Sequence, residues 1–179
     1  MGRGVPASPL AGRKPPLRAL LGTIVFVLLV PGSVIALGPF LLTRWYLAPP
    51  LGGASWTRWL GVVLFFAGLP VFVNFLVRFV WEGHGTPAPV APTRRLVVGG
   101  AFRYVRNPGY LGVLAMLFGQ GLFFASPAVL LYASGVGIAF HVFVLLYEEP
   151  TLRRQFGAAY VAYCREVPRW IPRLRPRRR

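Results

Sequence analysis

Long apolar stretches separated by short basic segments form the dominant pattern of this chain. No charged side chain occurs from Ala19 to Thr43 or from Trp59 to Val77. About 20 apolar residues suffice to cross a bilayer, because a helix rises about 1.5 Å per residue and the hydrocarbon core is about 30 Å thick. Each stretch therefore predicts one membrane-spanning helix. Pro31-Gly32 and Gly38-Pro39 predict a kink or an early end of the first helix, because proline removes a helix hydrogen bond.

A third stretch, between Arg106 and Glu148, lacks acidic and basic residues other than histidine and is too long for one span. Ala125-Ser126-Pro127 offers a tight break within it, since Ser-Pro favours a turn. Division at this point predicts helices over Pro108–Phe124 and Pro127–Glu149. Their short connection requires an antiparallel hairpin. The whole pattern predicts an all-α, polytopic membrane protein with about four transmembrane helices.

A different pattern begins after Pro150. Charged residues there alternate with an apolar face, which predicts an amphipathic helix lying on the membrane or packed on the preceding loop. The apolar residues at helical spacing are Leu152, Phe156, Tyr160, Tyr163 and Val167. The final RWIPRLRPRRR, which includes the basic segment 173–179, predicts a solvated tail in contact with anionic lipid.

The basic residues predict the orientation of the chain in the membrane. They gather in the N-terminal segment, in the loop between the second and third predicted spans, and in the C-terminal segment. The opposite side holds only Arg44 and Arg58. Because Arg and Lys collect in cytoplasmic segments, both termini and the middle loop are expected to be cytoplasmic, in the cell membrane of a bacterium.

Composition supports the membrane class and limits the alternatives. Hydrophobic residues make up 55% of the chain and charged residues 13%, against about 25% charged residues in a soluble domain. A net charge of +16 is also typical of nucleic-acid binding, but no nucleic-acid motif is visible. Cys164 is the single cysteine, so neither an internal disulfide nor a metal site is expected. One membrane domain over residues 1–179 is expected, and the oligomeric state is left open.

The middle loop, Glu82 to Gly112, is rich in glycine and proline. Irregular backbone at membrane depth is tolerated where it is buried in protein or lines a cavity, so the loop is either a structured ligand loop or an ordinary interfacial connection. Within it, Pro108 suits the first turn of a helix and Asn107 a helix cap. Free N–H groups at that point, beside Arg106, can hold an anion.

Glu148 and Glu149 are half of the four acidic residues in the chain. At the end of the fourth predicted span they oppose the helix dipole and repel each other, so a neutralising partner is expected. Arg106, Arg153 or Arg154 can supply it in a structural ion pair. A cationic ligand can supply it equally well, and these residues alone leave both interpretations open.

His141 lies seven residues before Glu148, on the same helical face. It is either a packed residue of the span or a candidate general base in an apolar cavity. Asn74, near the end of the second predicted span, can line the same cavity.

Two segments of the chain resemble a known superfamily. LVVGGAFRYVRNPGYLG, followed by YEEPTLRRQFGAAYVAYCREVPRWIP, resembles the isoprenylcysteine carboxyl methyltransferases and phospholipid N-methyltransferases over about residues 83 to 172. These are integral membrane enzymes that use S-adenosylmethionine. The resemblance implies a cofactor pocket between a cytoplasmic loop and the last helix hairpin. The residues it implies for cofactor binding are Leu96, Val97, Gly100, Phe102, Arg106, Asn107, Pro108, Tyr110, Glu148 and Glu149.

Three positions depart from the superfamily pattern. Asn107 replaces the commoner histidine, and Phe102 stands where many members have tyrosine. Val144 stands where the isoprenylcysteine enzymes have an arginine that grips the substrate carboxylate, which argues against a prenylated cysteine. E-E-P looks more like the phospholipid branch.

The expected function is methyl transfer from S-adenosylmethionine to a lipid-like or amphiphilic carboxylate or amine that enters from the bilayer. Arg106 and His141 are the candidate catalytic residues. Asn74 and Val144 are the candidate substrate residues. Two alternatives are a membrane reductase that uses NADPH, as the similar sterol reductases do, and a non-catalytic membrane protein that binds lipid or a partner.

Overall fold

A computed structural model describes residues 21, 24–25, 27–81 and 96–177 of the 179-residue chain. The N-terminal basic segment and the first part of the middle loop, 82–95, lie outside these ranges. Within them the chain is helical and has no strand, which confirms the all-α prediction for the described residues. The elements are η1 Ser33–Leu37, α2 Gly38–Thr43, η2 Leu51–Gly53, α3 Trp56–Trp81, η3 Gly100–Arg103, α4 Pro108–Phe123, α5 Pro127–Phe143, η4 Val144–Glu148 and α6 Glu149–Glu166.

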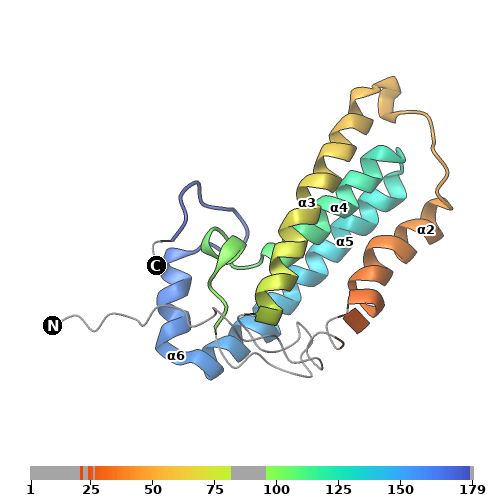
Figure 1. The fold of residues 1–179 in the computed structure, drawn as a ribbon. Coiled ribbons are helices and arrows are strands. Elements are labelled where there is room, and N and C mark those ends of the chain that lie inside the picture. The colour runs from red at the N-terminus through yellow and green to blue at the C-terminus, as the bar shows by residue number, and fades with distance from the viewer. Residues whose placement is uncertain (1–20, 22–23, 26, 82–95, 178–179) are drawn as a thin grey trace.

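Helices α3, α4 and α5 form a bundle with α2 alongside, and α6 turns away at one end (Figure 1). The closest packing is between α3 and α4, because glycines face each other across it. A Cβ atom on Gly61 would lie 2.5 Å from the carbonyl oxygen of Gly119, and one on Gly68 would lie 2.6 Å from that of Gly112. Glycine thus lets the two backbones approach closely, as small residues do between membrane helices.

Two helices are long and apolar enough to cross a membrane, Trp56–Arg78 and Pro127–Glu166. The apolar helices Val27–Thr43 and Pro108–Phe123 are shorter, so the four-span topology stays a prediction. Large hydrophobic side chains such as Phe66, 63% exposed, point outward. Helices that face lipid show such outward apolar side chains, since lipid tails are as apolar as leucine.

The predicted break between α4 and α5 is confirmed. Helix α4 ends at Phe123, and Pro127 opens α5. The hydroxyl of Ser126 caps α5 by accepting a hydrogen bond from the backbone N–H of Val129 at 3.3 Å. Ala125 has a left-handed backbone with φ 53°, which reverses the chain in a few residues.

Neither Gly38-Pro39 nor Glu149-Pro150 ends a helix, so the early end offered for the first helix and the predicted end at Glu149 are wrong, whereas the alternative of a kink at Gly38-Pro39 stays a prediction. The chain stays helical past Pro39 and past Pro150, and in each case a π-helical turn comes directly before the Xaa-Pro pair. The backbone N–H of Gly38 donates to the carbonyl oxygen of Ser33, and that of Glu149 to Val144, five residues back. A proline in a regular helix collides with the carbonyl four residues earlier. We infer that the wider π-turn relieves this collision at Pro39 and Pro150, whereas α3 continues through Pro70 without such a turn.

Helix α6 changes direction at Gly157, whose φ of 51° and ψ of −128° interrupt the helix. This backbone conformation suits glycine, which has no Cβ atom. The second arm buries Tyr160, Tyr163 and Val167 against a cluster that includes Leu96 and Val98 of the loop. The apolar face predicted after Pro150 therefore packs on protein, in two arms instead of one straight helix.

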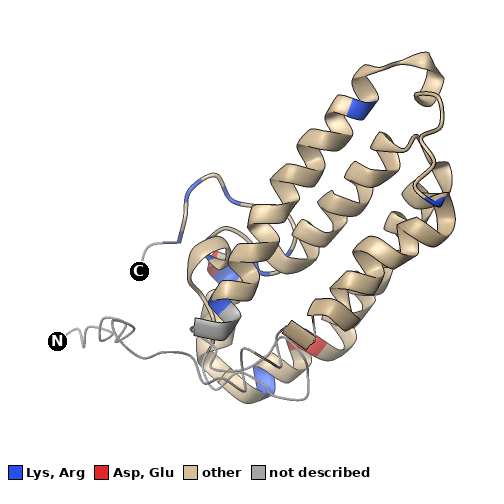
Figure 2. Ribbon diagram, turned by 45° about the vertical axis from the view of Figure 1, so that its right-hand side comes forward, with Lys and Arg blue, Asp and Glu red and all other residues tan. Residues whose placement is uncertain are grey.

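The C-terminal segment 169–177 is solvent-exposed at positions such as Ile171 and Leu174, which fits the predicted solvated tail, but it is also bound to the rest of the fold. Backbone N–H groups of Arg173 and Arg177 donate to the carbonyl oxygens of Tyr104 and Arg103, each at 3.0 Å. The guanidinium of Arg177 also forms an ion pair with Glu166 at 2.5 Å. These bonds hold the basic segment against η3 and α6, and Figure 2 shows basic residues, in blue, along the loop that leads to the C-terminus.

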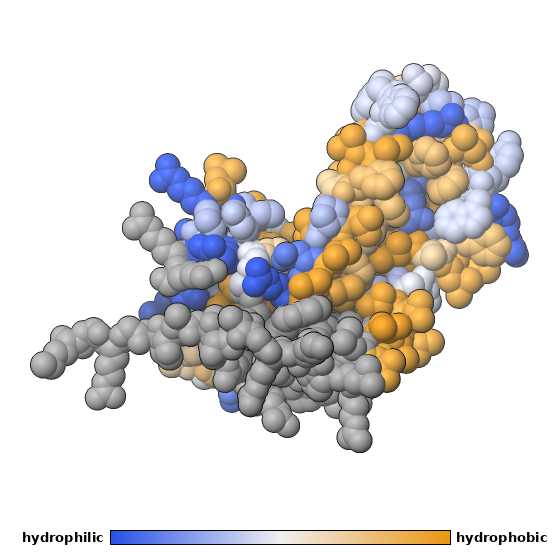
Figure 3. Space-filling view, viewed as in Figure 1, coloured by the Kyte–Doolittle hydropathy of each residue, from blue (hydrophilic) through white to orange (hydrophobic). Residues whose placement is uncertain are grey.

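Hydrophilic side chains gather around this C-terminal part, whereas hydrophobic ones cover much of the visible face of the bundle (Figure 3). The bundle thus presents a surface suited to lipid, and the C-terminal part a surface suited to water and headgroups.

Candidate active site

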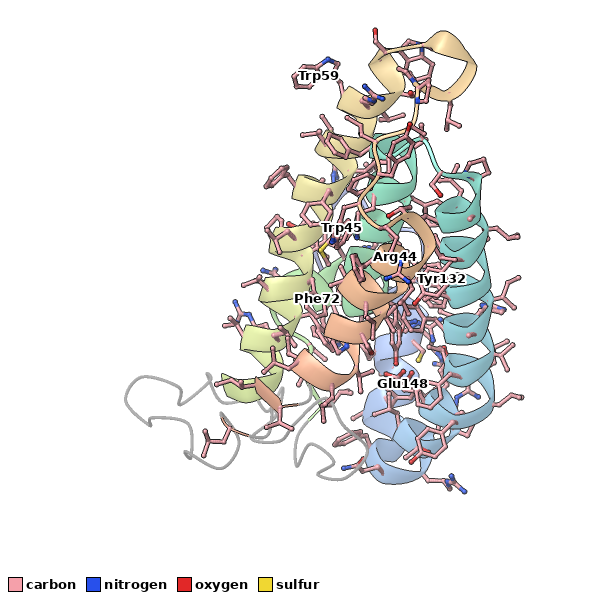
Figure 4. The ribbon with its side chains drawn as sticks, turned by 90° about the vertical axis from the view of Figure 1, so that its right-hand side faces the viewer. Arg44, Trp45, Trp59, Phe72, Tyr132 and Glu148 are labelled. Atoms are coloured by element: carbon pink, nitrogen blue, oxygen red, sulfur yellow. The ribbon has the colours of Figure 1, made fainter. Side chains whose placement is uncertain are left out.

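Four segments meet at the end of the bundle next to α6: the start of α4, the π-turn η4, the start of α6 and the residues after α6. Figure 4 places Glu148 at this end and Trp59 at the opposite end of the bundle. A cavity of about 380 Å³ also lies between α3 and α4, lined by Trp45, Phe65 and Phe123 among others. It sits at the C-terminal end of α4, away from the acidic pair, which adjoins the N-terminal end of that helix.

Glu149 is a buried carboxylate surrounded by arginines. Arg106 Nη1 lies 2.8 Å from its Oε1, Arg169 Nε 2.7 Å from Oε1 and Arg169 Nη2 3.0 Å from Oε2. Arg153 is more distant, at 3.7 Å. The predicted partners Arg106 and Arg153 are confirmed, whereas Arg154 instead donates to Thr151. The hydrogen bond to Glu149 raises the pKa of Arg169 above its ordinary value.

Arg106 is held by its backbone as well as by its side chain. Its N–H donates to the carbonyl oxygen of Pro168 at 2.9 Å, and Nη1 also donates to Cys164 Sγ at 3.2 Å. Its Nε is buried without a hydrogen-bond partner among the described residues. Arg106 therefore serves the ion pair with Glu149 in this structure, and its proposed catalytic role stays a prediction.

Glu148 has different surroundings from its neighbour. The hydroxyl of Tyr110 donates to its Oε2 at 2.8 Å, and within the described residues it forms no ion pair. The helix continues past Glu148, so the expected conflict with a helix C-terminus is absent. Of the two carboxylates, Glu148 is therefore the one that can accept a cationic or hydrogen-bonding ligand.

Aromatic rings lie beside the Tyr110–Glu148 pair. The ring of Tyr110 is centred 4.5 Å from that of Phe140 and 6.4 Å from that of Trp170. The indole Nε1–H of Trp170 donates to His141 Nδ1 at 3.0 Å, and His141 is otherwise exposed. The predicted residues Tyr110, His141 and Glu148 are thus brought to one end of the bundle.

Sequence reasoning missed Arg169 and Trp170. Both belong to the V-P-R-W stretch at the end of the family-like pattern, which was assigned to a solvated tail. The V-P-R-W motif could have indicated them. Its arginine suits an ion pair with the acidic pair, and its tryptophan suits an aromatic contact.

The loop residues mostly shape the backbone. Gly100 has φ 57°, and a Cβ atom there would collide with Asn74 Oδ1 and lie 2.8 Å from Arg78 Nε. Asn74 Oδ1 accepts a hydrogen bond from the N–H of Ala101 at 3.0 Å. Leu96 packs against the tyrosine cluster of α6, and Val97 is buried. The cofactor role of these loop residues and the substrate role of Asn74 stay predictions.

Phe102, Asn107 and Pro108 are all buried at the entry to α4. The carbonyl oxygen of Phe102 accepts the hydroxyl of Tyr163 at 2.8 Å. Pro108 opens the helix and Asn107 occupies the N-cap position, both as predicted, but the Asn107 side chain forms no capping hydrogen bond. Its amide Nδ2 donates instead to the carbonyl oxygen of Arg169 at 3.2 Å, which ties α4 to the C-terminal segment.

Val144 is fully buried in the π-turn, one turn before Glu148. An apolar side chain there adds no charge to the site. Its predicted contact with substrate is untested.

Comparison with known families and proteins places these residues in context. The family model for phospholipid methyltransferases matches residues 56–159, which include Tyr110, His141 and both glutamates. A methanethiol S-methyltransferase 2 of Bradyrhizobium diazoefficiens is 33% identical over 140 residues, 72% of this chain and 50% of that protein. A protein-S-isoprenylcysteine O-methyltransferase B of Arabidopsis thaliana is 31% identical over 78 residues, 44% of this chain and 40% of that protein.

The matched region thus spans half or less of the length of these curated relatives. No solved structure matches the chain.

Proposed function

The chain belongs to the phospholipid methyltransferase family of membrane methyltransferases, and from that premise we propose that it transfers a methyl group from S-adenosylmethionine to a lipid-like or amphiphilic acceptor. The acceptor is a carboxylate or an amine. The name of the Bradyrhizobium relative adds a thiol to these acceptor classes. The reaction takes place at the cytoplasmic face, where the basic segments lie under the positive-inside rule.

The observation that carries this proposal is the difference between the two carboxylates. Three arginines neutralise Glu149, whereas Glu148 receives only the hydroxyl of Tyr110 within the described residues. S-adenosylmethionine carries a sulfonium, an ammonium and ribose hydroxyls, so Glu148 fits it as a counter-charge or hydrogen-bond acceptor. The rings of Tyr110, Phe140 and Trp170 add aromatic faces that attract cations.

Bound there, S-adenosylmethionine supplies a methyl group on a positively charged sulfur. The residues of this chain then position the cofactor and surround it with a medium of low dielectric constant. Glu148 and the rings orient the cation, and apolar neighbours such as Val144 keep water away.

Binding of S-adenosylmethionine to the purified chain in lipid nanodiscs tests the proposal. We expect saturable binding, and we expect Glu148→Gln to weaken it about 10- to 100-fold, as loss of a charge-assisted hydrogen bond does. Glu166→Gln is the matched control, because Glu166 lies on the exposed face of α6 and pairs with Arg177. The affinity of this variant for S-adenosylmethionine should equal that of the unaltered protein.

The alternatives give different results in the same assay. Saturable binding of NADPH in place of S-adenosylmethionine would show a reductase. Binding of neither cofactor would favour a lipid-binding protein without catalysis. Labelled methyl transfer into a total lipid extract, followed by identification of the product, then names the acceptor.

A further inference from the structure

The contact between Trp170 and His141 decides which nitrogen of the imidazole carries the proton. Trp170 Nε1 lies 3.0 Å from His141 Nδ1. An indole N–H can only donate, so Nδ1 must present a lone pair. A neutral imidazole then carries its proton on Nε2.

This form of His141 is unsuited to general base catalysis. A general base needs a nitrogen with an accessible lone pair near the reacting proton. The lone pair of Nδ1 is engaged by Trp170, and Nε2 is protonated. A general-base role for His141 therefore does not fit this contact, and Nε2 is available only as a hydrogen-bond donor.

Trp170 reaches His141 because the ion pair around Glu149 holds the segment after α6. Arg169, its direct neighbour, bonds both oxygens of Glu149, and the N–H of Arg106 donates to the carbonyl oxygen of Pro168. The buried carboxylate thus fixes the backbone on the N-terminal side of Trp170.

We propose that Trp170 is a positioning residue that holds His141 in the Nε2-protonated form, and that His141 donates a hydrogen bond to a methyl acceptor that arrives as an anion. This inference rests on the proposed methyltransferase function. It narrows the acceptor to a thiolate or a carboxylate.

An anionic acceptor also balances the reaction without a base. Its lone pair forms the new bond to the methyl carbon, and the electron pair of the broken carbon–sulfur bond stays on the sulfur of the cofactor. One negative and one positive charge disappear together, so no proton has to leave the acceptor in this step. The N–H of His141 favours the anionic form of the acceptor before transfer, because a donated hydrogen bond stabilises the charged form.

Nitrogen-15 NMR of histidine-labelled protein in detergent tests the assignment without turnover. The chain has two histidines, so His84→Gln leaves His141 as the only signal. At neutral pH we expect Nε2 to be protonated and Nδ1 not, with Trp170→Phe converting this to a mixture of both tautomers. Protonated Nδ1 in the protein that retains Trp170, or an unchanged tautomer in Trp170→Phe, would overturn the inference.

Substitution of His141 itself separates a donor from a base. Glutamine places an amide N–H₂ near the position of imidazole Nε2 but cannot accept a proton. We expect His141→Gln to keep kcat within about 3-fold and His141→Ala to lower it about 10- to 100-fold, as loss of a hydrogen bond to a charged group does. An equal loss of kcat in both variants would show that His141 acts as a base, and would contradict the proposal.

Three acceptor probes distinguish the substrate classes: methanethiol, a farnesylated N-acetylcysteine and phosphatidylethanolamine. Turnover of the thiol or of the carboxylate supports an anionic acceptor and distinguishes a thiolate from a carboxylate. Turnover of the amine alone would overturn it. Absence of S-adenosylmethionine binding would instead count against the proposed function, and the NMR result would still decide the state of His141.

Discussion

Glu148 and Glu149 are adjacent along the helix but have different hydrogen-bond and ion-pair partners. Glu149 is buried among Arg106, Arg153 and Arg169, and so it joins α4, α6 and the C-terminal segment. Glu148 receives one hydroxyl within the described chain. The acidic pair thus divides into a carboxylate that joins structural elements, Glu149, and a carboxylate that we propose binds the cofactor, Glu148.

Replacement of Glu149 by glutamine should destabilise the protein. The substitution removes the buried negative charge that neutralises the guanidinium groups of Arg106 and Arg169. The expected loss is about 3 kcal/mol of unfolding free energy, at the low end for broken buried pairs because Arg169 is partly exposed. Denaturation in mixed detergent micelles, followed by circular dichroism, measures it. A stability equal to that of the unaltered protein would show that the ion pair contributes nothing.

The packing of helices depends on residues that break helices in other settings. Two π-turns let the chain pass Pro39 and Pro150 without ending a helix, and Gly157 turns α6 back onto the loop. Gly61 and Gly68 on α3 meet Gly119 and Gly112 on α4. Each pair of glycines is seven residues apart along its helix, about two turns, so both lie on one face. This spacing is visible in the sequence and indicates a close helix contact.

Gly68→Ala should lower the stability of the bundle. The added methyl group would lie 2.6 Å from the backbone oxygen of Gly112 and 2.9 Å from the Cβ of Ala115. Backbone cannot move aside cheaply, so a loss of about 1–3 kcal/mol is expected from overpacking. Thermal unfolding in detergent measures the effect.

Gly135→Ala is the matched control, because a Cβ atom at Gly135 meets nothing within 4 Å. It should leave stability unchanged or raise it, since alanine favours helix over glycine by about 1 kcal/mol. A similar loss in both variants would contradict the packing argument.

At the scale of the molecule, the distribution of charge over the described residues predicts one orientation in the membrane. The arginines after α6 are bound to η3 and Glu166. Arg44 and Arg58 flank the link from α2 to α3, since Arg44 caps the end of α2 and Arg58 lies in the first turn of α3. The acidic pair shares its end of the bundle with the basic C-terminal segment, so the positive-inside rule predicts that the proposed site faces the cytoplasm.

Cysteine labelling tests this orientation. In a Cys164→Ser background, Ser55→Cys should react with a membrane-impermeant maleimide on intact bacterial cells, because Ser55 is exposed in the link before α3. Leu174→Cys, at a fully exposed position in the C-terminal segment, should react only after the cells are opened. The reverse pattern would show the opposite topology and place the acidic pair outside the cell.

Much of the local architecture was predictable. Ser126 and Pro127 marked the hairpin because capping and turn formation depend on neighbouring residues. The failures have a common cause. Whether Pro150 ends a helix depends on how the preceding turn is wound, and whether Asn107 caps α4 depends on the competing carbonyl of Arg169. Residue types alone contain neither fact.

The sequence by itself determined the membrane class, the helical content and the family-like pattern, because hydrophobic runs, charge and short motifs are properties of local composition. Only the tertiary structure decided which partner each carboxylate has and which nitrogen of His141 holds the proton. Glu149 meets Arg106 across 43 residues, and Trp170 meets His141 across 29. Contacts over such separations arise from packing, which local patterns do not specify.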